Sequence, residues 1–228
     1  MTAFSPRLDI LPPSQRLLWP ELKPAARLGY VLYGGTAIAL RLGHRTSVDF
    51  DFFSEKRLDR DVLFESLPFL KTAQVLQDRP DTLTVLVTPA RGSEDIVKVS
   101  FFGSITLGRV GVPQWTHDVV AQIASAEDLL GTKLKVMLQR IESKDYLDTA
   151  AMLQSGTSLA TGLGSARALF GHAFQPSECL KALVYFEGGD LEVLPLEVKR
   201  QLIAVVKEVK AIPQLPILDR SLALSSNY

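Results

Sequence analysis

The sequence predicts an α+β fold, in which a small mixed sheet flanked by helices is followed by a helical C-terminal half. Two observations predict it. Between residues 30 and 102, short apolar or alternating segments typical of strands are interrupted by helical segments. Between residues 125 and 154, apolar residues recur with a helical period. We therefore expect a sheet-bearing core at residues 1–118 and a helical half at residues 119–228, packed on that core.

The N-terminal half supplies the sheet. Five prolines within residues 1–27 leave room only for short helical pieces. An apolar strand is expected at residues 30–33, and a helix at 36–43, where Gly43 ends it. Polar and aromatic residues alternate over residues 48–53, which predicts a strand. Further along we expect a helix at 59–67 and strands at 72–76, 83–88 and 95–102.

The C-terminal half is predicted to be helical. Residues 125–154 form a helix by period and propensity, with one possible break at Ser143. Ser125 and Asp128 resemble a capping box in which Asp replaces Glu. Ser, Thr and Gly residues predict a loop at 155–164, and two further helices are expected at 178–186 and 196–209.

The composition excludes several classes of protein. The chain has 228 residues, 46% of them hydrophobic, and 25 basic residues balance 25 acidic ones. This mixture is typical of globular proteins, and a net charge of zero disfavours a protein that coats nucleic acid through bulk charge. The single cysteine, Cys179, cannot form an internal disulfide, which favours a reducing cytoplasm. The longest uncharged apolar stretch, residues 28–40, is too short to span a bilayer, so no membrane partner is expected.

The first candidate site combines a glycine turn with two carboxylates. Asp49 and Asp51 are two residues apart in a predicted strand, so both side chains project from one face. Carboxylates held this close repel each other unless a cation lies between them, and oxygen ligands of this kind suit Mg²⁺ with substrate phosphates. Gly34 and Gly35 precede a helix, where free N–H groups can bind phosphate, and the Thr36 hydroxyl can add a donor.

Each part of this pattern has a structural interpretation as well. An isolated Asp-x-Asp is more often part of a surface strand or turn, and a strand-Gly-Gly-helix connection is usually only a tight turn. Arg45 can either hydrogen-bond its own loop or contact a phosphate through its guanidinium fork. His44 beside it is not expected to bind a metal for which oxygen ligands are already present.

The second candidate site is a group of charges between residues 133 and 148. On a continuous helix Lys133, Arg140, Lys144 and Asp148 would fall within an arc of about 80°. Residues 133–144 carry four basic residues against one acidic residue, a local excess of +3 that suits an anion. From the spacing alone, a solvated charged face is the favoured alternative. Asp145 argues against that alternative. On the continuous helix it falls in an apolar stripe, where a carboxylate needs a partner; the stripe consists of Leu134, Leu138, Ile141 and Met152.

Together the two motifs carry a resemblance to a known family. Residues 34–53, GGTAIALRLGHRTSVDFDFF, and residues 128–148, DLLGTKLKVMLQRIESKDYLD, resemble the motifs of AbiEii/AbiGii-type nucleotidyltransferases of the DNA-polymerase-β-like superfamily. Residues 181–187 and 194–195 are also similar, so the resemblance covers about residues 25–210. It implies the nucleotidyltransferase fold. It also implies that Asp49 and Asp51 bind the metal and act in catalysis, and that Gly34, Gly35 and Thr36 hold the nucleotide phosphates.

The resemblance extends to the second site and has one exception. It implies that Lys133 and Arg140 bind the triphosphate or the transition-state charge, and that Lys144, Asp145 and Asp148 complete the site or hold its helix. Lys133 and Asp148 are therefore candidate catalytic residues, and Arg45, Arg140 and Lys144 candidate nucleotide ligands. The superfamily commonly has a third carboxylate on a later strand, where this chain has Ser100. Serine is a poor metal ligand beside a carboxylate, which puts the acceptor chemistry in doubt more than nucleotide binding.

The function implied is a Mg²⁺-dependent transfer of a nucleoside monophosphate from an NTP to an RNA or protein acceptor. The biological role implied is that of the toxin of a bacterial toxin–antitoxin or phage-defence system, with a cognate antitoxin as partner. The alternatives are a small-molecule nucleotidyltransferase of the antibiotic-modifying type, a non-catalytic nucleotide-binding module, which Ser100 suggests, and a plain interaction protein.

Overall fold

The computed structural model describes residues 3–89 and 95–224, which form two compact units. Unit 1 contains the residues up to Gly108, Val112–Ala124 and the residues from Asp219 onward; unit 2 contains Arg109–Gly111 and Ser125–Leu218. The expected division after residue 118 falls before the last strand of unit 1, and the contacts divide the chain after that strand. Residues 109–111 belong to unit 2, and the residues from Asp219 onward belong to unit 1. A single division of the sequence therefore cannot separate the two units.

Unit 1 is built on a mixed sheet of eight strands among the residues described, in the order β1-β7-β8-β2-β3-β6-β5-β4. Neighbours run parallel in the pairs β1–β7, β2–β8 and β3–β6 and antiparallel in the others. The strands are β1 (Ala3–Phe4), β2 (Val31–Tyr33), β3 (Asp49–Phe53), β4 (Gln74–Arg79), β5 (Thr82–Val87), β6 (Val97–Phe102), β7 (Gln114–Thr116) and β8 (Gln122–Ile123). The strands expected in the N-terminal half are therefore confirmed with small shifts, and the short strands β1, β7 and β8 are additional.

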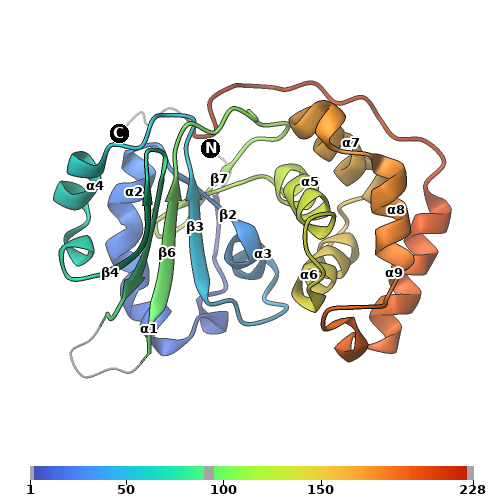
Figure 1. Ribbon diagram of the computed structural model, residues 1–228, viewed down its shortest axis with the longest axis horizontal. Coiled ribbons are helices and arrows are strands. Elements are labelled where there is room, and N and C mark those ends of the chain that lie inside the picture. The colour runs from blue at the N-terminus through green and yellow to red at the C-terminus, as the bar shows by residue number, and fades with distance from the viewer. Residues whose placement is uncertain (1–2, 90–94, 225–228) are drawn as a thin grey trace. The chain divides into compact units, whose positions relative to one another are not determined.

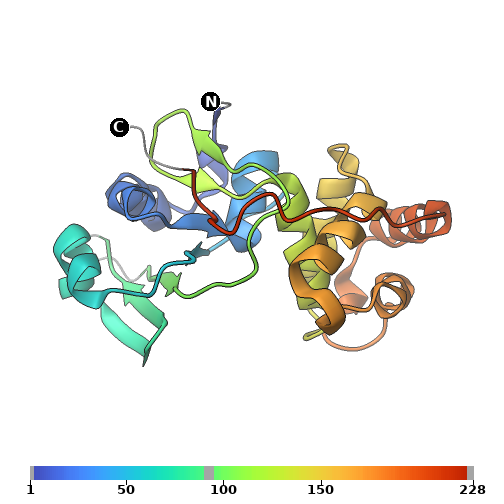
Figure 2. The same cartoon turned by 90° about the horizontal axis from the view of Figure 1, so that it is seen from above.

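Helices cover both faces of this sheet. Figures 1 and 2 show α3 on one face and α1, α2 and α4 on the other. The helices are α1 (Pro13–Leu18), α2 (Lys23–Arg27), α3 (Gly34–Leu42) and α4 (Arg60–Ser66), with 3₁₀ turns at Leu8–Ile10, Trp19–Leu22 and Pro68–Lys71. Gly43 ends α3 in the left-handed conformation, as predicted, and Asp59 caps α4 by accepting a hydrogen bond from the Val62 N–H at 3.1 Å.

Aromatic side chains fix the orientation of the central strand β3. Phe50 and Phe52 are fully buried on one face, and Phe52 stacks on Phe101 of β6 with 5.5 Å between the ring centroids. Burial of each such ring stabilises the fold by about 1.5–3 kcal/mol. Because side chains alternate along a strand, the same burial turns Asp49 and Asp51 to the opposite face. The alternation predicted from the sequence is therefore confirmed.

Unit 2 is helical (Figure 2). Its helices are α5 (Ala126–Met137), α6 (Ser143–Gln154), α7 (Leu159–Phe170), α8 (Pro176–Val184) and α9 (Leu196–Glu208), with 3₁₀ turns at Gly171–Ala173 and Leu191–Val193. The predicted cap of α5 is confirmed, because the Ser125 hydroxyl accepts a hydrogen bond from the Asp128 N–H at 3.1 Å. The Asp128 carboxylate in turn accepts from the N–H groups of Val110 at 2.7 Å and Gly111 at 3.1 Å, which attaches residues 109–111 to unit 2.

The loop expected at residues 155–164 is wrong for its second half, where α7 begins at Leu159. Ser158 caps this helix by accepting a hydrogen bond from the Thr161 N–H at 3.0 Å. A Cβ atom on Gly162 would lie 2.5 Å from Leu130, so this glycine permits close packing of α7 on α5 rather than marking a loop. In the part of the chain that the structure describes, no helix is long and apolar enough to cross a membrane.

Candidate functional site

Asp49 and Asp51 lie on the face of β3 that the buried phenylalanines leave open. The side chain of Asp49 is 33% exposed, and its Oδ2 lies 3.0 Å from Nζ of Lys98. Lys98 stands opposite Asp49 in the parallel pairing of β3 with β6, so strand register brings the ammonium to the carboxylate. Lys98 is not among the residues predicted from the sequence; its position two residues before Ser100 in the same predicted strand was the available signal.

Ser100 occupies the position on β6 that stands opposite Asp51. Opposed residues of a parallel pair share a face of the sheet, so a carboxylate at residue 100 would join the two aspartates. Ser100 is buried, and no group of three or more His, Cys, Asp or Glu side chains suited to hold a metal is found among the described residues. Mg²⁺ is commonly held by one or two protein carboxylates together with substrate phosphates. Two aspartates fit an ion of that kind, brought in with a nucleotide.

The turn between β2 and α3 lies directly beside Asp51. Gly34 has φ +75°, a conformation that favours glycine, and a Cβ atom on it would lie 2.9 Å from Oδ2 of Asp51, so a larger residue would also displace this carboxylate. Gly34 and Gly35 are half-buried and begin a nine-residue helix whose N-cap, Tyr33, makes no side-chain capping bond. Backbone N–H groups of a first helical turn favour anions. A glycine turn that opens a helix and two carboxylates are thus neighbours within unit 1.

Thr36 and Arg45 make contacts within unit 1. Thr36 is 1% exposed, and its hydroxyl donates to the carbonyl oxygen of Asp49 and lies 2.8 Å from Oγ of Ser47. The hydroxyl thus ties the start of α3 to β3, and its role as a donor to phosphate stays a prediction. Arg45 donates from Nη1 to the carbonyl oxygen of Thr46 at 2.9 Å, in keeping with the loop-binding alternative.

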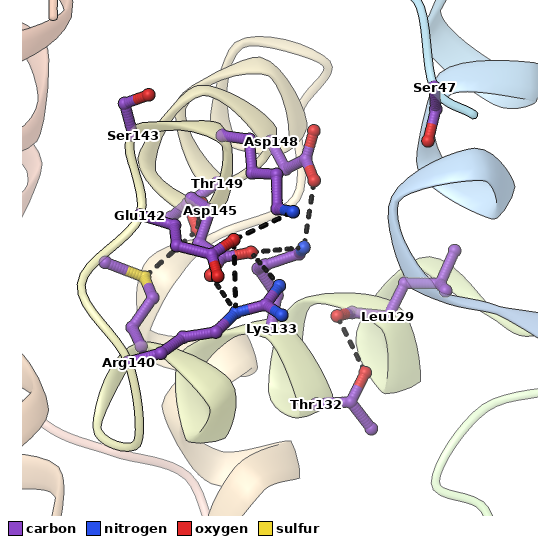
Figure 3. A network of polar contacts seen from close by, with 12 residues as sticks. Ser47, Leu129, Thr132, Lys133, Arg140, Glu142, Ser143, Asp145, Asp148 and Thr149 are labelled. Carbon is purple, nitrogen blue, oxygen red and sulfur yellow. Dashed lines mark hydrogen bonds and ion pairs between the residues drawn. The ribbon is translucent and has the colours of Figure 1, made fainter. Parts of the chain in front are cut away.

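The second site is a buried charge cluster in unit 2, which Figure 3 shows from close by. Nζ of Lys133 lies 2.8 Å from Asp145 Oδ1 and 2.9 Å from Asp148 Oδ2. Arg140 reaches the same Asp145 with two hydrogen bonds, from Nε at 2.9 Å and from Nη2 at 3.1 Å. The side chains of both aspartates are completely buried, and that of Lys133 is 7% exposed. We call these four residues, Lys133, Arg140, Asp145 and Asp148, the Lys133 cluster.

The surroundings of Asp145 set its charge state. Burial would by itself raise the pKa of its carboxyl, but the hydrogen bonds from Arg140 and the positive charge of Lys133 outweigh burial and hold the pKa below its usual range. Asp145 therefore stays ionised at neutral pH. The expectation that this carboxylate needs a partner is confirmed, because two cations bind it.

The continuous helix assumed for these charges is wrong. α5 ends at Met137 and α6 begins at Ser143, so the break considered at Ser143 is present and the common arc does not exist. The solvated-face alternative describes Lys144, which is 48% exposed and lies 2.8 Å from Glu142, but it fails for the buried Lys133. The local excess of +3 is also reduced, because Asp145 and Asp148 of α6 form ion pairs with Lys133 of α5.

Comparisons with known proteins agree with the resemblance. The family described as "Nucleotidyl transferase AbiEii toxin, Type IV TA system" matches residues 16–204. An uncharacterized protein of Aquifex aeolicus (strain VF5) is 30% identical over 169 residues, which cover 72% of this chain and 77% of that protein.

Two solved structures share the fold. A crystal structure from H. pylori, provisionally described as a nucleotidyltransferase, has a TM-score of 0.58 at 19% identity and covers 86% of this chain and 92% of its own. An antigenic nucleotidyltransferase-like protein from Paracoccidioides brasiliensis has a TM-score of 0.50 at 17% identity and covers 82% and 92%.

Proposed function

The chain belongs to the AbiEii nucleotidyl transferase toxin family of type IV toxin–antitoxin systems, and from this premise we propose that it transfers a nucleoside monophosphate from Mg²⁺-bound NTP to a hydroxyl group of RNA or protein. Family membership makes it a nucleotidyltransferase that uses an NTP and has a cognate antitoxin. The metal, the acceptor and the residue roles are the proposal. The observation that carries it is the close approach of the Gly34 turn to the carboxylate of Asp51 on β3, which leaves too little room for a Cβ atom at residue 34 unless that carboxylate moves.

In unit 1, the proposal assigns the nucleotide to this turn. The N–H groups of Gly34 and Gly35 would bind phosphate oxygens, and Thr36 would hold the turn against β3 through its bond to the Asp49 carbonyl. Asp49 and Asp51 would hold Mg²⁺, which neutralises phosphate charge when bound. Lys98 lies beside the carboxylate of Asp49 and would add a positive charge near the phosphates.

The reaction itself is an exchange at the α-phosphorus. The acceptor oxygen forms a bond to this phosphorus, the bond to the β-phosphate oxygen breaks, and pyrophosphate leaves. Ser100 cannot take the acceptor proton as a carboxylate would, so the proton would pass to Asp51, directly opposite it, or to a water, or the step would proceed without a general base. In unit 2, the family resemblance assigns Lys133 and Asp148 to catalysis, and the exposed parts of Arg140 and Lys144 to phosphate binding.

The test is a labelling experiment with conservative variants. Wild-type protein, Asp49→Asn and Asp51→Asn are incubated with each α-labelled NTP, Mg²⁺ and a bacterial lysate, and label is followed in RNA, protein and small-molecule fractions. Wild type should label RNA or protein, and both variants should lose about two or more orders of magnitude in rate. Asp61→Asn, an exposed residue in the first turn of α4, is the matched control and should label normally.

Two outcomes would contradict the proposal. Normal labelling by both Asn variants would remove the metal assignment, and label confined to small molecules would replace the macromolecular acceptor with the antibiotic-type alternative. Melting curves of all variants, recorded in the same buffer, separate a lost function from a lost fold.

A further inference from the structure

The first residue of α6, which lies shortly before Asp145 and Asp148 of the Lys133 cluster, is bound by a loop far along the chain. Asp190 accepts two hydrogen bonds from Ser143, one from the backbone N–H to Oδ1 at 2.5 Å and one from the hydroxyl to Oδ2 at 2.6 Å. Ser143 is the first residue of α6, and its own N-cap, Glu142, makes no side-chain capping bond. A carboxylate 47 residues away therefore supplies the cap that the local sequence lacks.

Two glycines bring this carboxylate into place. Gly188 and Gly189 have φ values of +86° and +54°, a backbone region that residues other than glycine rarely adopt. A Cβ atom on Gly189 would lie 2.2 Å from the carbonyl oxygen of Ile141, so the loop backbone rests directly on the connection between α5 and α6. We call residues 188–190 the Gly-Gly-Asp bracket. The bracket therefore supports the connection between α5 and α6.

The bracket acts on the part of α6 that carries the buried charges. Ser143, which Asp190 holds, is two residues before Asp145 and five before Asp148. The connection under Gly189 also carries Arg140, whose guanidinium binds Asp145. A shift in the first turn of α6 would therefore move both aspartates relative to the ammonium of Lys133 on α5.

We propose that Asp190 is a positioning residue, which fixes the first turn of α6 and thereby the geometry of the Lys133 cluster used in nucleotidyl transfer. This inference rests on the proposed function for its catalytic part. The two bonds from Ser143 lower the pKa of the Asp190 carboxyl, so the cap carries its charge at neutral pH and also interacts favourably with the helix N-terminus.

The test compares two variants of Asp190 with two controls in the full chain. Asp190→Ala removes both acceptors, whereas Asp190→Asn keeps a carbonyl oxygen for the Ser143 N–H. Ser143→Ala removes only the hydroxyl bond. Glu192→Ala changes an exposed acidic residue two positions further along the same loop.

Amide hydrogen exchange over residues 143–148 and the kcat and KM of labelled-NTP transfer are measured for each protein. Asp190→Ala should speed exchange about fivefold to tenfold and lower kcat by a similar factor, with a smaller change in KM for the NTP. Asp190→Asn should recover most of both losses, Ser143→Ala should lose less than Asp190→Ala, and Glu192→Ala should match wild type.

Each remaining outcome overturns a different statement. Faster exchange in Asp190→Ala with an unchanged kcat would leave Asp190 as a cap without a positioning role. Exchange and kcat equal to those of Glu192→Ala would overturn the inference altogether. Absence of labelling by wild type would instead overturn the proposed function and the catalytic part with it, while hydrogen exchange would still decide whether Asp190 fixes α6.

Discussion

Unit 1 and unit 2 each hold a pair of aspartates, but the two pairs lie in opposite surroundings. Asp49 is one-third exposed on an open strand face and meets a lysine that is itself 40% exposed. Asp145 and Asp148 are completely buried and share a buried lysine, with Arg140 on the outer side of Asp145. The first pair is partly exposed, so an ion from solution could reach it. The second is an internal ion cluster that must stay together.

The difference follows from the way each pair is built. On β3, alternation alone places two carboxylates on one face, and the buried Phe50 and Phe52 hold the strand from the opposite face. In unit 2, the charges come from two helices and the connection between them, so tertiary packing has to assemble them. Exposed ion pairs contribute little to stability, whereas breaking a buried pair leaves an uncompensated charge. Removal of one charge should therefore change the stability of the protein little in unit 1 and strongly in unit 2.

The largest effect is expected when the lysine of the buried cluster is removed. Lys133→Met leaves Asp145 and Asp148 buried without their shared ammonium, and should lower the free energy of unfolding by about 3–5 kcal/mol. Lys144→Met, the matched change at a side chain that is 48% exposed, should cost less than about 1 kcal/mol. Urea denaturation followed by circular dichroism measures both. Equal losses would show that burial does not separate the two lysines.

The next effect is a loss of stability in acid. The pKa of Asp145 is lower in the folded protein than in the unfolded chain, where it is about 3.9. The contribution of Asp145 to the free energy of unfolding is therefore fully present above the pKa of the unfolded chain, and it is lost as the pH falls through the pKa of the folded protein. Asp128, whose pKa burial raises, changes in the opposite direction and favours the folded state on protonation.

The Asp145 contribution is isolated by comparing wild type with Asp145→Asn between pH 6 and pH 2.5. The variant should be less stable at pH 6, and the difference from wild type should shrink as the pH falls. A difference that stays constant over this range would contradict a lowered pKa in the folded state.

The sequence predicted the exposed pair better than the buried cluster. Alternation around Phe50 and Phe52 identified β3, and Gly34 with Gly35 identified the turn before α3, because both depend on neighbouring residues. The Lys133 cluster was found through the family motif, but its geometry was assigned to one long helix. The break between Met137 and Ser143 carries no glycine or proline, so local rules gave no firm reason to place it.

Long-range contacts account for most of what local patterns missed. The strands β1, β7 and β8 have only two or three residues each, and they are strands because of their partners. Gly162 suggested a loop, yet its small size serves the packing of α7 on Leu130. Asp190 lies in a loop, yet its carboxylate accepts hydrogen bonds from Ser143 at the start of α6, 47 residues earlier in the chain. None of these partners can be identified from the local segment alone.

A smaller effect is expected at the turn beside the exposed pair. In Gly34→Ala, the new Cβ would meet Asp51 at 2.9 Å in a conformation with φ +75°. The backbone strain should cost about 1–2 kcal/mol, and displacement of the carboxylate should weaken Mg²⁺–NTP binding at least about tenfold. Gly156→Ala is a matched control, since Gly156 has φ +102° and nothing within 4 Å of its Cβ position. It should show a loss of stability without a loss of nucleotide affinity, as measured by calorimetry.

The smallest effect should come from the exposed ion pair itself. Lys98 lies where a cation would approach Asp49, so in the absence of nucleotide it competes with a divalent ion for that carboxylate. Lys98→Met should therefore raise the affinity for Mn²⁺, a spectroscopic probe of such sites, by up to about fivefold, because exposed pairs contribute at most about 1 kcal/mol. The gain should vanish in Lys98→Met combined with Asp49→Asn. If the Mn²⁺ affinity instead falls in Lys98→Met, the lysine stabilises the carboxylate pair rather than competing with the ion for Asp49. That result would contradict the competition argued from the ion pair between Lys98 and Asp49.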